Sequence, residues 1–170
     1  MADIQKIILP TKRTPHEKLA LEPFEEVLEQ YTELSKFTKQ YLTNRLVLND
    51  GGYFQFGDLR VDKSNRHIIL EVDHGGVTNL VKYRYCIDKN LIQKPVVLLQ
   101  LYRMNTQKDY ATHVELWKHL NEGMIEDLKD RFSAYIFTYH PKRLRSDLAA
   151  AVTMFEELLE KLNAHDFRLS

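Results

Sequence analysis

The spacing of apolar residues changes several times along the chain, and the changes divide it into helices and strands. From Leu21 to Tyr41, apolar residues recur every three or four positions, which predicts a helix. Thr14 suits its N-cap and Glu17 stands at the capping-box spacing, while Pro23 is expected to kink or restart the helix. Further helices are predicted over about 79–87, 110–128 and 148–162.

Short apolar or β-rich runs predict the strands, at about 3–9, 45–48, 53–61, 66–73, 96–101 and 134–139. The runs 96–101 and 134–139 are continuously apolar, which is typical of strands buried on both faces. The polar segment 62–66 suits a hairpin turn between the two strands that flank it. Strands followed by alternating helices and strands predict an α/β fold, a mixed central sheet flanked by helices, in one domain over 1–170.

Composition narrows the function classes. The 170 residues are 44% hydrophobic and 28% charged, as in ordinary globular domains, and 24 basic residues balance 24 acidic ones. No overall positive field therefore attracts nucleic acid. The single cysteine, Cys86, excludes an intramolecular disulfide and a cysteine-based zinc site, and its aromatic helix favours a buried bystander. No apolar run approaches the roughly 20 residues of a membrane span, and the first residues have too short an apolar centre for a secretory signal, so we expect a cytoplasmic protein without a membrane partner.

Three acidic residues, Asp58, Glu71 and Asp73, stand at the ends of predicted strands. If the hairpin is symmetric about Ser64-Asn65, Asp58 lies opposite Glu71, with Cβ atoms about 5 Å apart. Asp73 shares their face through the two-residue period of a strand. Facing carboxylates repel, so this register predicts a compensating cation such as Mg²⁺, whereas a slip of one residue would dissolve the arrangement.

A structural interpretation stands beside each of these chemical ones. Each acid alone is also explained as a solvated residue at a strand end. Gly75 and Gly76 serve either as a chain reversal with positive φ or as backbone contacts to a phosphate. Gln100 interrupts an apolar run, and because burying its amide unpaired costs about 1–3 kcal/mol, we expect a partner on the strand that carries Glu71.

A helix, a meander with Asp58 and then Glu71-Val72-Asp73, a second helix and a further strand together resemble the PD-(D/E)XK nuclease superfamily, the restriction-endonuclease-like fold, over about 15–103. The resemblance implies that Asp58, Glu71 and Asp73 bind Mg²⁺, with Mn²⁺ as a substitute, and that a lysine orients the attacking water. Asp73 stands where that lysine is expected. Some members supply the cation from the following helix, which implies a catalytic role for Lys82, with Asn79 on the same helical face contacting phosphate or substrate.

The resemblance implies Mg²⁺-dependent phosphodiester hydrolysis of nucleic acid, most simply by a DNA endonuclease. The alternative is a catalytically degenerate module of the same fold that binds nucleic acid or protein without cleavage. Lys142, Arg143 and Arg145 form a basic cluster that suits a nucleic-acid contact, although a solvated patch explains it equally. A homodimer is compatible with the sequence, which singles out no surface for it.

Overall fold

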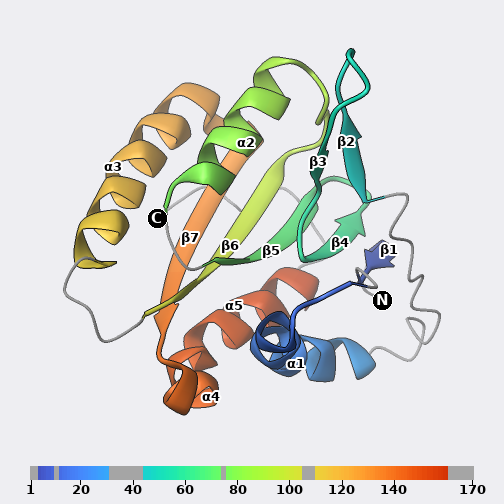
Figure 1. Cartoon of the computed structure of the whole chain (residues 1–170). Coiled ribbons are helices and arrows are strands. Elements are labelled where there is room, and N and C mark those ends of the chain that lie inside the picture. The colour runs from blue at the N-terminus through green and yellow to red at the C-terminus, as the bar shows by residue number, and fades with distance from the viewer. Residues whose placement is uncertain (1–3, 10–11, 31–43, 74–75, 105–109, 161–170) are drawn as a thin grey trace.

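A mixed β-sheet organises the computed structural model, which describes residues 4–9, 12–30, 44–73, 76–104 and 110–160 (Figure 1). The strand order is β1-β4-β5-β6-β7. These strands are β1 (Ile4–Ile8), β4 (Leu59–Lys63), β5 (His67–Asp73), β6 (Val96–Arg103) and β7 (Phe132–Tyr139). β1 and β5 each pair with β4 antiparallel, whereas β5, β6 and β7 run parallel. The predicted α/β fold with a mixed sheet is confirmed.

Helices cover both faces of this sheet (Figure 1). They are α1 (Pro15–Glu29), α2 (Thr78–Asp88), α3 (Tyr110–Leu128), α4 (Leu144–Asp147) and α5 (Ala149–Glu160), with 3₁₀ turns at Lys129–Arg131 and Pro141–Arg143. α1 and α5 pack against one face, and α2 and α3 against the other. Cys86 is buried in α2, as expected. No helix in the described ranges is long and apolar enough to cross a membrane.

The alternation of side chains along β5 decides which face carries the candidate chemistry. Leu70 packs into the core under α1 and α5, whereas Ile69 packs into the core under α2 and α3. Because every second residue of a strand shares a face, Glu71 and Asp73 point to the side of α2 and α3.

The predicted strand over 53–61 is wrong, because the chain bends within it. Its first part, β3 (Tyr53–Gln55), pairs with β2 (Arg45–Val47) in a separate two-stranded sheet, and only the second part enters the central sheet as β4. Gly57 lies at the bend with φ of 89°, and a Cβ there would come 2.7 Å from Ile69 Cγ2. A glycine is therefore required where the chain passes from the β2–β3 hairpin to β4.

The helix ends also differ from the sequence predictions in part. Thr14 and Glu17 form the predicted capping box, and α1 runs through Pro23 without the predicted restart. The predicted continuation of that helix to residue 41 lies outside the described residues. α2 begins at Thr78, close to the predicted start, and has Val77 as its N-cap without a side-chain cap.

Candidate active site

The register of β4 and β5 brings Asp58 close to Glu71, whose charge acts on the Asp58 carboxyl group. The paired residues run from Leu59 with Leu70 to Asp62 with His67, and Asp58 directly precedes the first of them. The Asp58 N–H donates to the Leu70 carbonyl at 2.9 Å, and because Leu70 is already the partner of Leu59, the regular ladder ends at that pair. The register expected from a hairpin symmetric about Ser64-Asn65 is confirmed from Leu59 to Asp62, whereas the expected direct pair of Asp58 with Glu71 is not among the paired residues.

Glu71 receives two hydrogen bonds from α2. Its side chain is buried, and its Oε1 accepts from Lys82 Nζ at 2.5 Å and from the Tyr83 hydroxyl at 2.5 Å. Lys82 and Glu71 therefore form an ion pair with little solvent exposure. The structure brings the lysine of the helix to the second acid, as expected from the sequence.

Tyr83 is a contact that the sequence interpretation missed. Its side chain is fully buried, and burial together with the charge of Glu71 raises the pKa of its hydroxyl well above the ordinary value. The hydroxyl thus stays protonated and donates to Glu71. In the sequence, this contact was indicated by nothing more than the hydroxyl group of Tyr83, an aromatic residue next to Lys82 in the predicted helix.

Asp58 is almost as buried as Glu71, and both of its side-chain oxygens accept hydrogen bonds. Oδ2 accepts from the Val72 N–H at 2.8 Å, and Oδ1 from Gln55 Nε2 at 2.7 Å. Burial, and then the facing charge of Glu71, raise the pKa of Asp58 to about 8. Unless a metal ion is bound beside it, Asp58 therefore holds a proton at neutral pH. Gln55 was also missed, because it reaches Asp58 across the bend at Gly57.

Gln100 of β6 is paired with Glu71 of β5, but the hydrogen-bond partner expected for its amide on β5 is found on α2 instead. Its side chain is fully buried, and its Oε1 accepts from Asn79 Nδ2 of α2 at 3.3 Å. Its Nε2 has no hydrogen-bond partner within the described part of the chain. An unpaired buried amide costs about 1–3 kcal/mol, so this donor is suited to an oxygen atom of a bound water or substrate.

The remaining residues of the predicted site are less closely joined to it. Asp73 lies at the end of β5 beside Tyr102. Among the described residues, no group of three or more His, Cys, Asp or Glu side chains is placed to hold a metal, so Asp73 does not complete a three-carboxylate set with Asp58 and Glu71. Gly76 has φ of 111°, the conformation expected of a chain reversal. Gly75 lies outside the described residues.

The donor set still fits a hard divalent cation. Mg²⁺ is usually held by one or two carboxylates, with waters and phosphate oxygens completing its coordination. Asp58 and Glu71 supply two carboxylates, and a cation between them would offset the burial and the charge of Glu71 that raise the pKa of Asp58.

The basic cluster has protein partners of its own. Arg145 binds two carboxylates of α1, with Nη2 at 2.6 Å from Glu26 Oε1 and 3.1 Å from Glu22 Oε2. α1 covers the sheet face opposite to α2. Lys142 and Arg143 are exposed, and their proposed contact with nucleic acid stays a prediction.

The candidate site thus consists of two facing carboxyl groups, an ammonium group bound to one of them and an unpaired amide beside it. The resemblance to PD-(D/E)XK nucleases rests on these residues and on the order of the elements. Comparisons of the chain with protein-family models, with curated proteins and with solved structures found no match.

Proposed function

We propose that the protein is a metal-dependent hydrolase that cleaves phosphodiester bonds in nucleic acid, with DNA as the substrate and the cytoplasm as its location. The observation that carries the proposal is the Glu71–Lys82 ion pair, both members of which lie close enough to Asp58 to act on its pKa. Hydrolysis of a phosphodiester needs a cation site, a positioned water and positive charge near the phosphate. Two carboxyl groups and an ammonium within one buried cluster supply groups for all three.

Each residue of the chain has a distinct part in this proposal. Asp58 and Glu71 would hold Mg²⁺ or Mn²⁺, which when bound polarises a phosphate oxygen and acidifies a water. Lys82 has three N–H donors, so its bond to Glu71 leaves donors for the attacking water or a phosphate oxygen. Gln100 Nε2 offers a further donor, held by the bond from Asn79 to the other end of its amide.

The test is cleavage of single-stranded and duplex DNA with Mg²⁺ or Mn²⁺. We expect cleavage by the wild type, no measurable cleavage by Glu71→Gln, and a rate lowered by about 10²- to 10³-fold in Lys82→Met. Lys89→Met is the matched control, because Lys89 is an exposed lysine just after the same helix. Equal cleavage by wild type and Glu71→Gln, or none by either with both folded, would refute the proposal.

A degenerate module that binds nucleic acid or protein without cleavage is the second candidate. It is favoured by one observation: both oxygens of Asp58 and Oε1 of Glu71 already accept hydrogen bonds from the protein. Such a module binds its partner equally well with and without a chelator, and binding is indifferent to Lys82→Met. Calorimetric titration with Mn²⁺ separates the two candidates, because only the hydrolase has a cation site that Asp58→Ala removes.

A further inference from the structure

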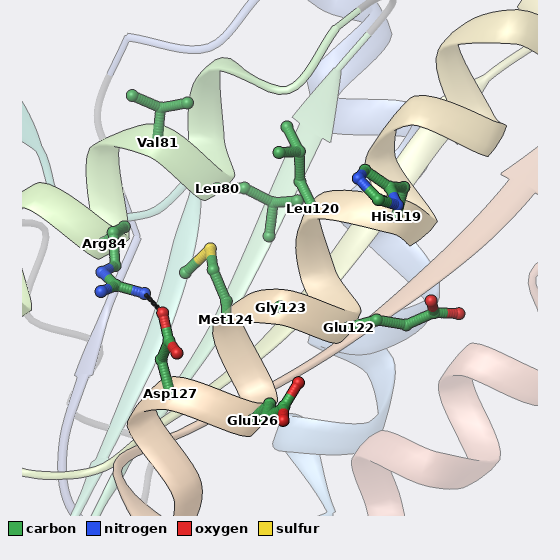
Figure 2. A pocket seen from close by; sticks show the side chains of 10 residues that line it. All are labelled: Leu80, Val81, Arg84, His119, Leu120, Glu122, Gly123, Met124, Glu126 and Asp127. Atoms are coloured by element: carbon green, nitrogen blue, oxygen red, sulfur yellow. Dashed lines mark hydrogen bonds and ion pairs between the residues drawn. The ribbon is translucent and has the colours of Figure 1, made fainter.

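A groove with a volume of about 530 Å³ lies between α2 and α3 (Figure 2). Leu80, Leu120 and Met124 give it an apolar lining, and charged residues stand around it. Arg84 of α2 forms an ion pair with Asp127 of α3 at 2.7 Å across the groove. The groove is therefore a mainly apolar surface with a charged border, the composition of a protein interface.

Exposed apolar residues border this groove on both helices. Val81 of α2 lines it and is 57% exposed, and Leu116 of α3, one turn before Leu120, is 46% exposed. Leu116, Leu120 and Gly123 recur at spacings of four and three, which places them along one side of α3. Exposed apolar residues gathered around a groove mark an interaction surface more often than scattered ones do.

Gly123 adds an independent observation. It lies well inside the 19-residue helix α3, where glycine is less favourable than alanine by about 0.5–1 kcal/mol. Gly123 is exposed, and apart from its chain neighbours and the backbone of its own helix turn, no atom of the described structure lies within 4 Å of the position that its Cβ would occupy. The fold itself does not need this open space, which suits the close approach of a side chain from another molecule.

The charges along α3 indicate which molecule approaches. Acidic residues dominate its second half, with Glu122, Glu126 and Asp127. Its first half carries His113, Lys118 and His119, and its acid, Glu115, pairs with Lys118. A second α3 in antiparallel orientation keeps the two acidic halves apart and opposes the helix dipoles, whereas a parallel one would place acid against acid.

We propose that the groove is a self-association site, in which α3 of a second copy packs antiparallel against the first. Leu116 precedes Gly123 by seven residues, about two helical turns. If the helices cross midway between these residues, Leu116 of each copy enters the space at Gly123 of the other. Such a contact is isologous and closes as a two-fold dimer. It stands independently of the proposed hydrolysis.

Sedimentation equilibrium of the full chain over a concentration series tests the proposal. We expect a species of twice the 20.1 kDa chain mass. Leu116→Asp and Gly123→Leu are each expected to weaken self-association by about tenfold or more. Leu116→Asp places a charge in the apolar contact, and Gly123→Leu fills the space that Leu116 of the other copy would enter. Leu19→Asp is the control, since Leu19 is 58% exposed on α1, against the other face of the sheet, and its change should leave association unaltered.

A double variant distinguishes this geometry from a general effect of surface change. Leu116→Ala together with Gly123→Leu exchanges the large and small residues, so it is expected to associate more tightly than Gly123→Leu alone. A wild type that stays monomeric throughout the series would overturn the proposal. So would a dimer that both single variants, folded by circular dichroism, leave intact.

Discussion

Replacing Asp58 by asparagine tests whether its carboxyl group is protonated in the folded protein. Asparagine has nearly the same shape but does not titrate. The side chain of Asp58 is 8% exposed, and it accepts from the Val72 N–H and from Gln55 Nε2. Burial and the facing Glu71 raise its pKa from 3.8 to about 8. The variant therefore removes one strongly perturbed titration and little of the packing.

The sign of the effect follows from the bound protons. Between pH 4 and 8 the folded protein holds the proton of Asp58 and the unfolded chain has lost it, so the free energy of unfolding falls as pH rises. Each pH unit in this window costs about 1.4 kcal/mol, or about 3 kcal/mol from pH 5 to pH 7. Above the folded pKa this contribution levels off.

Urea unfolding, followed by circular dichroism with a chelator present, measures this effect from pH 5 to pH 9. The free energy of unfolding of Asp58→Asn minus that of the wild type is expected to rise by about 3 kcal/mol from pH 5 to pH 7, and then to flatten above pH 8. Asp50→Asn, at an exposed turn, is the control, and its difference from the wild type should stay constant. A difference that is equally constant for Asp58→Asn would refute the assignment of a buried, protonated carboxyl.

Three further predictions concern the cation and the fold. At a hundredfold excess over its Kd, Mn²⁺ should stabilise the wild type by about 3 kcal/mol, measured by thermal melting. Binding should be tighter at pH 9 than at pH 6, because protons compete with the metal for Asp58. Asp58→Asn should show no such stabilisation by Mn²⁺. Lys63→Met should lower the free energy of unfolding by about 1.5–3 kcal/mol, because the buried ammonium donates to the last carbonyls of α5, and an unchanged urea midpoint would contradict this. Gly57→Ala should cost at least about 1–2 kcal/mol, since φ is 89° and the added Cβ meets Ile69; a variant as stable as the wild type in urea would show that the bend relaxes.

The sequence predicted those parts of the site that depend on local geometry. The polar turn between two β-rich runs defined a register that is confirmed from Leu59 to Asp62, and this register brings Asp58 close to Glu71. The short connection between β5 and α2 limited how far Lys82 could lie from Glu71, and the two meet at 2.5 Å. A polar residue within the apolar run 96–101 drew attention to Gln100, which lies next to Glu71 in the sheet. Two-residue and 3.6-residue periods are local properties, so one sequence is enough to read them.

Contacts that depend on how separate elements pack were not predictable in this way. Gln55 reaches Asp58 because Gly57 turns the chain between them, and a glycine at the end of an apparent strand does not by itself indicate that bend. Tyr83 reaches Glu71 because α2 is rotated to bury its ring. Likewise, Arg145 forms ion pairs with carboxylates of α1 that lie more than a hundred residues earlier in the chain.

The lysine that contacts Glu71 stands on α2 and not on β5, and this decides what determines its position. A lysine on β5 would be held by the sheet, whereas Lys82 is held by the packing of a helix. The buried ring of Tyr83 fixes the rotation of α2, and its hydroxyl shares Glu71 Oε1 with Lys82, so the two residues orient the carboxylate together. Val81, the preceding residue, lines the groove between α2 and α3. One helix therefore carries both the lysine of the candidate site and one wall of the groove proposed as the dimer contact.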